Sequence, residues 1–223
     1  MLFIAFLGGI LPACIWLFFW LLEDRCEPEP KRYIFLSFLA GMVGVLVVLP
    51  LEQLAEGYLA GTALLFAWAA LEELVKFGAA YVALRSAFFD EPLDAVIYLV
   101  TAALGFAALE NALFMLAPLM DGDFLRSVIT GNLRFMGAML LHTLASATIG
   151  IAIALSFYKP AATRKMVAAA GVVLAIVLHT LFNFFILNGG NDATFWIFLC
   201  IWVGIVAALL LVERVKQPAR DYC

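Results

Sequence analysis

The stretch PLDAVIYLVTAALGFAALENALF, residues 92–114, decides the fold class. It contains no Asp, Glu, Lys or Arg between Asp94 and Glu110, and it belongs to an apolar run over 93–119 that is long enough to cross a bilayer core. The chain has 223 residues, of which 66% are apolar, with only 13 Lys+Arg and 17 Asp+Glu. A soluble domain of this size would expose more charge, so the sequence predicts an all-α, polytopic transmembrane helical bundle.

Six further apolar runs are separated from this one and from each other by short charged stretches. The seven predicted spans are 2–22, 33–51, 58–84, 93–119, 135–158, 166–187 and 193–212. No basic residue precedes the first span and no small-residue cleavage pattern follows it, so we expect it to be retained. No stretch outside the spans is long enough to fold alone, which predicts one integral membrane domain over 1–223.

The basic residues predict the orientation of the chain in the membrane. The other side of the membrane holds only Arg126 and Arg134, whereas ten basic residues lie on one side: Arg25, Lys31, Arg32, Arg85, Lys159, Arg164, Lys165, Arg214, Lys216 and Arg220. The positive-inside rule therefore predicts a multi-pass plasma-membrane protein with its N-terminus outside and its C-terminus in the cytoplasm.

The four cysteines agree with this topology. Cys14 and Cys200 fall in predicted spans, while Cys26 and Cys223 fall on the predicted cytoplasmic side, where thiols stay reduced. The sequence has no Cys-x-x-Cys pair, and we expect no disulfide.

A few polar residues lie inside the predicted spans, whereas other acids, such as Glu29 and Glu91, fall in loops and call for no special environment. A charge at mid-bilayer costs roughly 2.5–3.5 kcal/mol, so the intramembrane groups need partners or a water-filled cavity. Lys76 follows Glu72 by four residues and Glu73 by three, so its ammonium can reach either carboxylate on one helix. The whole set is Glu72, Glu73, Lys76, Glu110, Asn111, His142, His179 and Asn183.

The positions of these residues along their spans predict that they meet. Glu110, His142 and His179 lie about seven to nine residues from the outer ends of their spans, and Glu72 lies nearer the middle. We therefore expect one polar site in the outer half of the membrane, within catalytic helices over about 58–187. Taken singly, the Glu–Lys pair or either histidine could be only an interhelical clamp.

Such a set favours hydrolysis of a peptide bond by an activated water. Two adjacent buried carboxylates titrate as a coupled pair, and a nearby lysine can hold one of them ionised as a general base. Imidazole and carboxamide groups could stabilise the oxyanion. The sequence lacks Gly-x-Ser-x-Gly, His-Glu-x-x-His and Gly-x-Gly-Asp. No cofactor is predicted, but histidines and glutamates from different helices could also hold zinc.

Two non-proteolytic functions remain open at this stage. Intramembrane Glu and His chains also serve as proton relays, which would suit a proton- or ion-coupled transporter, although neither Glu-Glu-x-x-Lys nor His-x-x-x-Asn recurs in the other half of the chain. A scaffold whose polar groups only join helices is the third hypothesis.

Four stretches resemble the PrsW family of intramembrane proteases, which is related to the CAAX prenyl endopeptidase and CPBP group. They are LEELVKF (71–77), residues 92–114, RFMGAMLLHTLASATIG (134–150) and VLHTLFNF (177–184). The CAAX branch has Phe-x-x-x-His where this chain has Phe106-x-x-x-Glu110, which favours the PrsW branch. The resemblance implies an intramembrane endopeptidase that acts on a membrane-anchored protein, such as an anti-sigma factor cut near the extracytoplasmic face, with the lipid bilayer and no nucleic acid as its surroundings.

Site roles follow from the same resemblance. It implies that Glu72 activates the water, that Glu73 is its partner carboxylate and that Lys76 is the pairing cation. Glu110, His142 and His179 would complete the polar site, with His179 and Asn183 as oxyanion donors.

Overall fold

The computed structural model describes residues 1–24 and 27–216, and within these ranges the regular structure is entirely helical. The predictions for Cys26 and Cys223 lie outside the described residues. The helices are α1 (Leu2–Glu23), α2 (Lys31–Glu56), α3 (Gly61–Leu84), α4 (Pro92–Met120), α5 (Phe124–Met136), α6 (Ala138–Leu155), α7 (Ala161–Asn188) and α8 (Gly190–Lys216).

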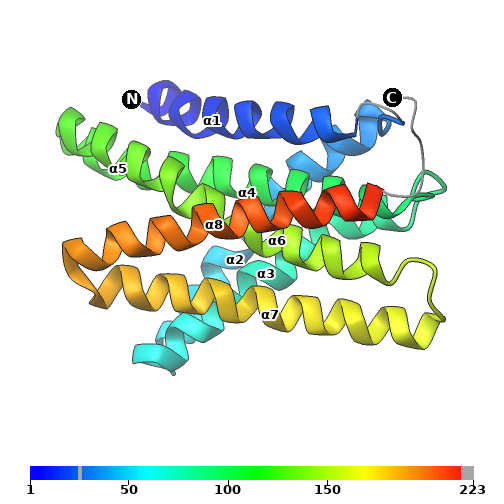
Figure 1. Ribbon diagram of the computed structural model, residues 1–223. Coiled ribbons are helices and arrows are strands. Elements are labelled where there is room, and N and C mark those ends of the chain that lie inside the picture. The colour runs from blue at the N-terminus through cyan, green and yellow to red at the C-terminus, as the bar shows by residue number, and fades with distance from the viewer. Residues whose placement is uncertain (25–26, 217–223) are drawn as a thin grey trace.

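These helices make the back-and-forth bundle that the sequence predicts (Figure 1). By length and composition, six segments of the described chain could cross a membrane: α1, α2, α4, α5 with α6, α7, and most of α8. The remaining predicted span, 58–84, corresponds to α3, which has 24 residues but carries Glu72, Glu73 and Lys76 in its middle. Helix α1 begins and α8 ends at opposite ends of the bundle (Figure 1). The multi-pass, all-α prediction is confirmed, and the side that each end faces stays a prediction.

One boundary differs from the sequence prediction. The sequence predicts that residues 124–136 lie largely in the connection before the fifth span. They form helix α5 instead, and only Gly137 separates this helix from α6. The Asp123 side chain accepts a hydrogen bond from the Arg126 backbone N–H at 2.9 Å and caps the helix. Arg126 and Arg134 suggested a loop, yet a capped helix carries both of them.

Helix α4 is the centre of the bundle. Its most apolar window is 89% buried, against 17% for α1 and 22% for α8, and it packs against α1, α2, α3, α5 and α6. Close approach to α2 requires glycine on both helices: a Cβ on Gly41 would lie 2.0 Å from the Ala102 carbonyl oxygen, and one on Gly105 would lie 2.0 Å from that of Phe38. This contact places the inner face of α2 beside the polar residues of α4.

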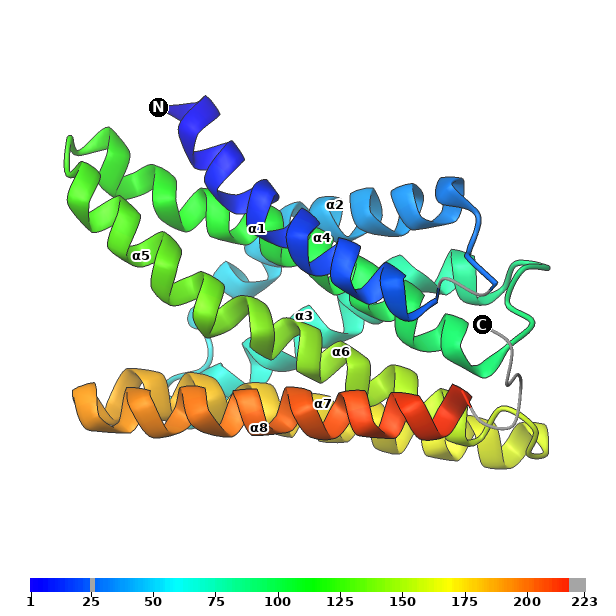
Figure 2. The same cartoon turned by 45° about the horizontal axis from the view of Figure 1, so that its top comes forward.

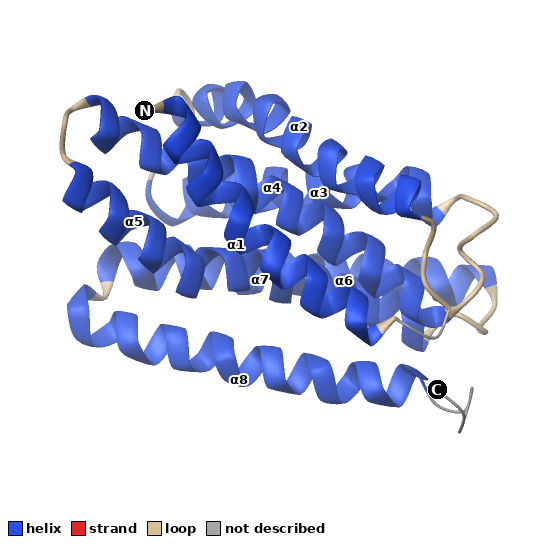
Figure 3. Cartoon of the chain, turned by 90° about the horizontal axis from the view of Figure 1, so that it is seen from above, coloured by secondary structure: helices blue, strands red, loops and turns tan. Residues whose placement is uncertain are grey.

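The outer helices present large apolar side chains away from the bundle. Phe18 on α1 and Val203 on α8 are 66% and 61% exposed. Figures 2 and 3 show α8 along one flank of the bundle and α2 on another, with α4 and α6 between them. Exposed apolar surface of this kind suits lipid rather than water.

A cluster of acids lies where α4 begins, and we call Asp24, Glu29, Glu91 and Asp94 the acidic cluster. Glu91 and Asp94 form a reciprocal capping box at the start of α4, and Tyr98 donates a hydrogen bond to Glu29. The prediction that Glu29 and Glu91 are ordinary loop acids is wrong, because Glu29 is only 8% exposed and Glu91 is partly buried. Burial raises the pKa of Asp24 to about 7, of Glu91 to about 7 and of Glu29 to about 8.

Candidate active site

Four helices bring the predicted polar residues into one connected site. Glu72, Glu73 and Lys76 come from α3, Glu110 from α4, His142 from α6 and His179 from α7. Hydrogen bonds join residues of all four helices, so the expected convergence is found.

Lys76 is the hub of the buried part of the site. Its ammonium donates to Glu73 Oε1 at 2.6 Å and to His142 Nδ1 at 2.8 Å, and it lies 3.7 Å from Glu72 Oε2. The Lys76 and Glu73 side chains are both fully buried. Lys76 therefore pairs mainly with Glu73 rather than with both glutamates equally, and the pair keeps two charges stable away from water.

The hydrogen bonds assign a neutral tautomer to each histidine. His179 Nδ1–H donates to Glu73 Oε1 at 2.7 Å, which leaves the lone pair of its Nε2 on the side of Glu72. His142 Nε2–H donates to Glu110 Oε2 at 2.9 Å, so its Nδ1 accepts from Lys76. The two rings lie edge to face at 5.2 Å between centroids. Each imidazole is thus fixed by a carboxylate, as carboxylate–histidine pairs in hydrolytic sites are.

Glu72 differs from its neighbour because no hydrogen bond among the described residues engages either of its carboxylate oxygens, whereas Glu73 Oε1 accepts from Lys76 and from His179. The Oε2 atoms of both glutamates are buried without a partner among the described residues. His142 Nδ1 lies 3.8 Å from Oε2, and His179 Nε2 lies 3.9 Å from Oε1, both beyond direct hydrogen bonding. A buried oxygen with basic atoms at this spacing has room for a bridging group, such as a water molecule.

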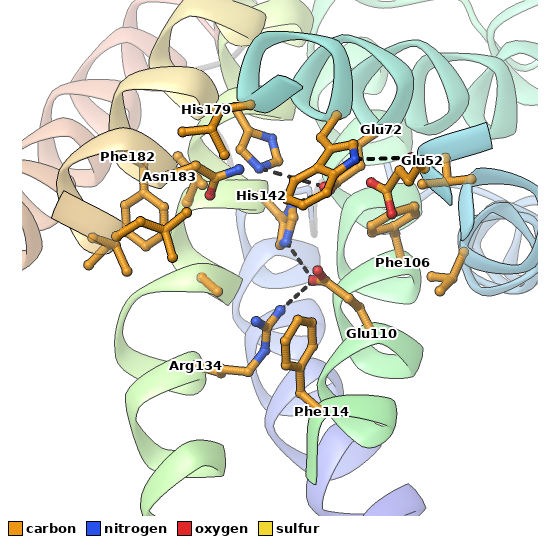
Figure 4. Close-up of a pocket in the computed structure, with 18 of the residues that line it drawn as sticks. Glu52, Glu72, Phe106, Glu110, Phe114, Arg134, His142, His179, Phe182 and Asn183 are labelled. Atoms are coloured by element: carbon orange, nitrogen blue, oxygen red, sulfur yellow. Dashed lines mark hydrogen bonds and ion pairs between the residues drawn. The ribbon is translucent and has the colours of Figure 1, made fainter. Parts of the chain in front are cut away.

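The site opens into a cavity of about 560 Å³ between the helices. Five of the seven predicted site residues line it, while Glu73 and Lys76 lie behind its wall. Figure 4 shows Glu72, His142, His179 and Asn183 around the inner part of the cavity, with Glu110 and Arg134 further along it. Most of the remaining lining is apolar, including Phe106, Phe182 and Phe198. An apolar cavity with a few convergent polar groups is typical of a binding or active site.

Arg134 is a member of the site that the residue pattern did not identify. It donates to Glu110 Oε2 at 2.5 Å and to Asn111 Oδ1 at 2.6 Å, and its guanidinium stacks on Phe114. Because Arg134 stands just before the predicted fifth span, the sequence predicts that its charge lies outside the spans. Asn111 proves to be a partner of Arg134 rather than part of the cavity wall.

Glu52 and Trp68 were missed as well. Both line the cavity, and the Trp68 indole N–H donates to the Glu52 backbone carbonyl at 3.4 Å. A signal for Glu52 was available, because it follows the apolar residues Val45 and Val48 by seven and four positions and shares their helix face. Its place one residue past the predicted second span hid that relation.

Metal ligands are present in the same set. One atom from each of Glu72, His142 and His179 lies within 4.8 Å of the other two. Two histidines and a glutamate are a known ligand set for catalytic zinc. The acidic cluster contains a second such group, Asp24, Glu91 and Asp94, but backbone N–H groups bind Asp24 and Asp94 there.

Comparison with known proteins identifies the family of this chain. A family model described as "PrsW family intramembrane metalloprotease" matches residues 29–211. Protease PrsW of Geobacillus kaustophilus is 28% identical over 96% of this chain and 92% of its own length. The proteins of the same name from Bacillus subtilis and Clostridioides difficile are 24% and 29% identical, over 86% and 82% of this chain and 84% and 79% of their own. No solved structure matches. The chain belongs to the PrsW family of intramembrane proteases.

Proposed function

We propose that this chain is an endopeptidase that cleaves membrane-anchored proteins with a water molecule activated by Glu72. The observation that carries the proposal is the Glu72 carboxylate, which lines the inner end of the cavity without a hydrogen bond among the described residues and lies 3.9 Å from the Nε2 lone pair of the fixed His179 ring. In a low-dielectric site an unsatisfied carboxylate oxygen is costly, and a water that donates to it removes that cost.

The reaction needs a base, a proton path and a donor for the oxyanion. Water bound at Glu72 gives its proton to that carboxylate as its oxygen forms a bond to the scissile carbonyl carbon. The C–N bond then breaks, and the proton held at Glu72 passes to the leaving amine. Atoms balance without any other reactant.

Asn183 is the donor that the geometry leaves available for the oxyanion. It lines the cavity beside His179, and no hydrogen bond engages its side chain among the described residues. In the assigned tautomer His179 Nε2 accepts, so His179 could donate to the oxyanion only after gaining a proton. We assign the oxyanion contact to Asn183 first and give His179 the role of positioning Glu72.

The behaviour of Lys76 and Glu73 supports this division of roles. Their ion pair is complete without Glu72, so Glu73 is held ionised as a structural partner. Glu72 faces the cavity with neither oxygen hydrogen-bonded among the described residues, and the Lys76 ammonium lies 3.7 Å from its Oε2. The base is therefore Glu72 and not Glu73.

A metal-dependent form of the same reaction is the second candidate, because the family description includes a metal. Glu72, His142 and His179 would hold the ion, with Glu73 and Glu110 orienting the two imidazoles from behind. When bound, such an ion would polarise the carbonyl and acidify a bound water. We place this second, because both ring nitrogens of His142 already have partners, Lys76 and Glu110, one of which would have to be displaced.

A membrane-anchored anti-sigma factor is the substrate class that fits the family and an opening in the outer half of the membrane. This assignment depends on the predicted orientation of the bundle.

The proposal is tested with purified protein in liposomes and a single-span peptide substrate. Wild type should release two fragments whose new termini, read by mass spectrometry, map within or beside the hydrophobic segment. Glu72→Gln should abolish cleavage while its thermal unfolding remains cooperative. Asp121→Asn removes an exposed acid outside the cavity and serves as the control that stays active. Full activity of Glu72→Gln would reject the assignment.

Elemental analysis of the same preparations separates the two candidates. Metal dependence predicts one zinc or similar ion per chain, lost in His179→Ala, together with inhibition by a chelator that added metal reverses. The glutamate mechanism predicts activity at full rate in protein that contains no stoichiometric metal.

A further inference from the structure

We infer that Glu52 forms a binding subsite for a basic side chain of the substrate, next to the bond that is cleaved. This inference rests on the proposed function and names a feature of its substrates: a lysine or arginine near the scissile bond. Glu56, one helical turn beyond Glu52, extends the subsite toward the end of α2.

The position of Glu52 on α2 sends its side chain into the bundle. Gly41, Val45, Val48 and Glu52 follow one another at intervals of four, three and four residues, and the first three are buried. The next residue on this face is therefore expected to be apolar. Instead it is a glutamate, and in Figure 4 its side chain reaches the cavity between Glu72 and Phe106.

A structural role does not account for Glu52. Among the described residues no hydrogen bond or ion pair engages its carboxylate, and the one hydrogen bond near it uses its backbone carbonyl. It lies in the last turns of α2, where the helix dipole disfavours negative charge. Exposure to water would explain Glu56, which is exposed, but Glu52 is partly buried in an otherwise apolar wall.

The charge balance of the cavity indicates the ligand. Glu52, Glu56, Glu72 and Glu110 line it, whereas Arg134 is the one lysine or arginine among the lining residues and is already paired with Glu110. Negative lining in a low-dielectric cavity attracts a cation and penalises an anion. A substrate segment with a basic residue would supply the missing partner of Glu52 as its scissile bond reaches Glu72.

The test measures binding, so it does not depend on hydrolysis. Fluorescent single-span peptides carry one Lys, Gln or Glu, scanned through the residues around the membrane boundary, and their Kd is measured on the full chain with Glu72→Gln in detergent micelles. We expect the Lys peptide to bind roughly tenfold more tightly than the Gln peptide at one or two adjacent positions, and the Glu peptide to bind most weakly.

Second substitutions in the Glu72→Gln chain decide whether Glu52 causes the preference. Glu52→Gln should reduce the Lys-to-Gln ratio of Kd values to near one, and Glu52→Lys should reverse it in favour of the Glu peptide. Asp121→Asn, which removes the same charge away from the cavity, should keep the ratio measured for Glu72→Gln alone. An absent Lys preference, or a ratio that Glu52→Gln and Glu52→Lys leave unchanged, overturns the inference. A failed proposed function shows separately, as peptides that bind to wild type and are never cut.

Discussion

Each half of α4 carries or contacts a group of buried acids, and the two groups differ in the partners that surround them. Near Glu110 the acids alternate with Lys76, Arg134 and two histidines. In the acidic cluster near Asp94, the donors among the described residues are backbone N–H groups and the Tyr98 hydroxyl. In the first group, cations and imidazoles engage Glu73 and Glu110 and leave Glu72 without a hydrogen bond beside a cavity. The second group caps a helix, and burial raises the pKa of Asp24, Glu29 and Glu91 to about 7, 8 and 7. A buried carboxylate oxygen without a partner therefore does not identify a candidate catalytic site, because Asp24 Oδ1 and Asp94 Oδ1 lack partners as well. The group near Glu110 differs by its cations, its histidines and its place on the cavity wall.

The largest effect is expected when Lys76, the cation that pairs with Glu73, is removed. Lys76→Met leaves Glu73 buried without a counter-charge, which should cost about 3–5 kcal/mol of stability and abolish cleavage. Thermal unfolding in detergent measures the first effect. Because the pair is the cause, Lys76→Met combined with Glu73→Gln should recover much of the lost stability. A single variant as stable as wild type would show that the two charges are not coupled.

A smaller effect is expected at Arg134, which contacts Glu110 at the edge of the candidate active site. Arg134→Gln removes the donors to Glu110 and Asn111, so Glu110 holds His142 less firmly, and kcat should fall about 10–100-fold with KM nearly unchanged. Arg134→Lys keeps the positive charge but lacks the planar guanidinium with its several donors, and it should recover part of the rate. Arg126→Gln, exposed on the same helix, is the matched control. Equal kcat in Arg134→Gln and Arg126→Gln would remove Arg134 from the site.

The smallest effect concerns the acidic cluster and follows from its pKa values. Burial raises the folded-state pKa of Asp24, Glu29 and Glu91 to about 7, 8 and 7, above the value of about 4 in an unfolded chain. The folded state then holds more protons, so the contribution of these groups to stability is greatest at acidic pH and is lost as pH rises from about 4 to 8.

Unfolding temperatures measured between pH 5 and pH 8 check this sign. Glu29→Gln, which still accepts from Tyr98, should reduce the decline by a few degrees, whereas the exposed Glu213→Gln should not. A decline of the same size in Glu29→Gln would show that Glu29 is not protonated in the folded protein.

The sequence predicted the part of the site that depends on helical spacing and hydropathy. Lys76 at three and four residues from Glu73 and Glu72 does contact one and approach the other, and Glu110, His142 and His179 join one connected site. Two kinds of information were missing. Which glutamate pairs fully with Lys76 depends on His179, which is far away in sequence. Glu52, Arg134 and the acidic cluster lay at or beyond predicted span ends, where hydropathy does not distinguish a buried acid from a solvated one.

The most direct test of the account compares the two adjacent glutamates. Cleavage per folded molecule is measured for Glu72→Gln and Glu73→Gln in the same liposomes, with folding assessed by thermal unfolding. We predict a folded and inactive Glu72→Gln, and a Glu73→Gln whose main defect is lost stability, because Lys76 then lies buried without its carboxylate. A folded, inactive Glu73→Gln beside an active Glu72→Gln would contradict the assignment of Glu72 as the base.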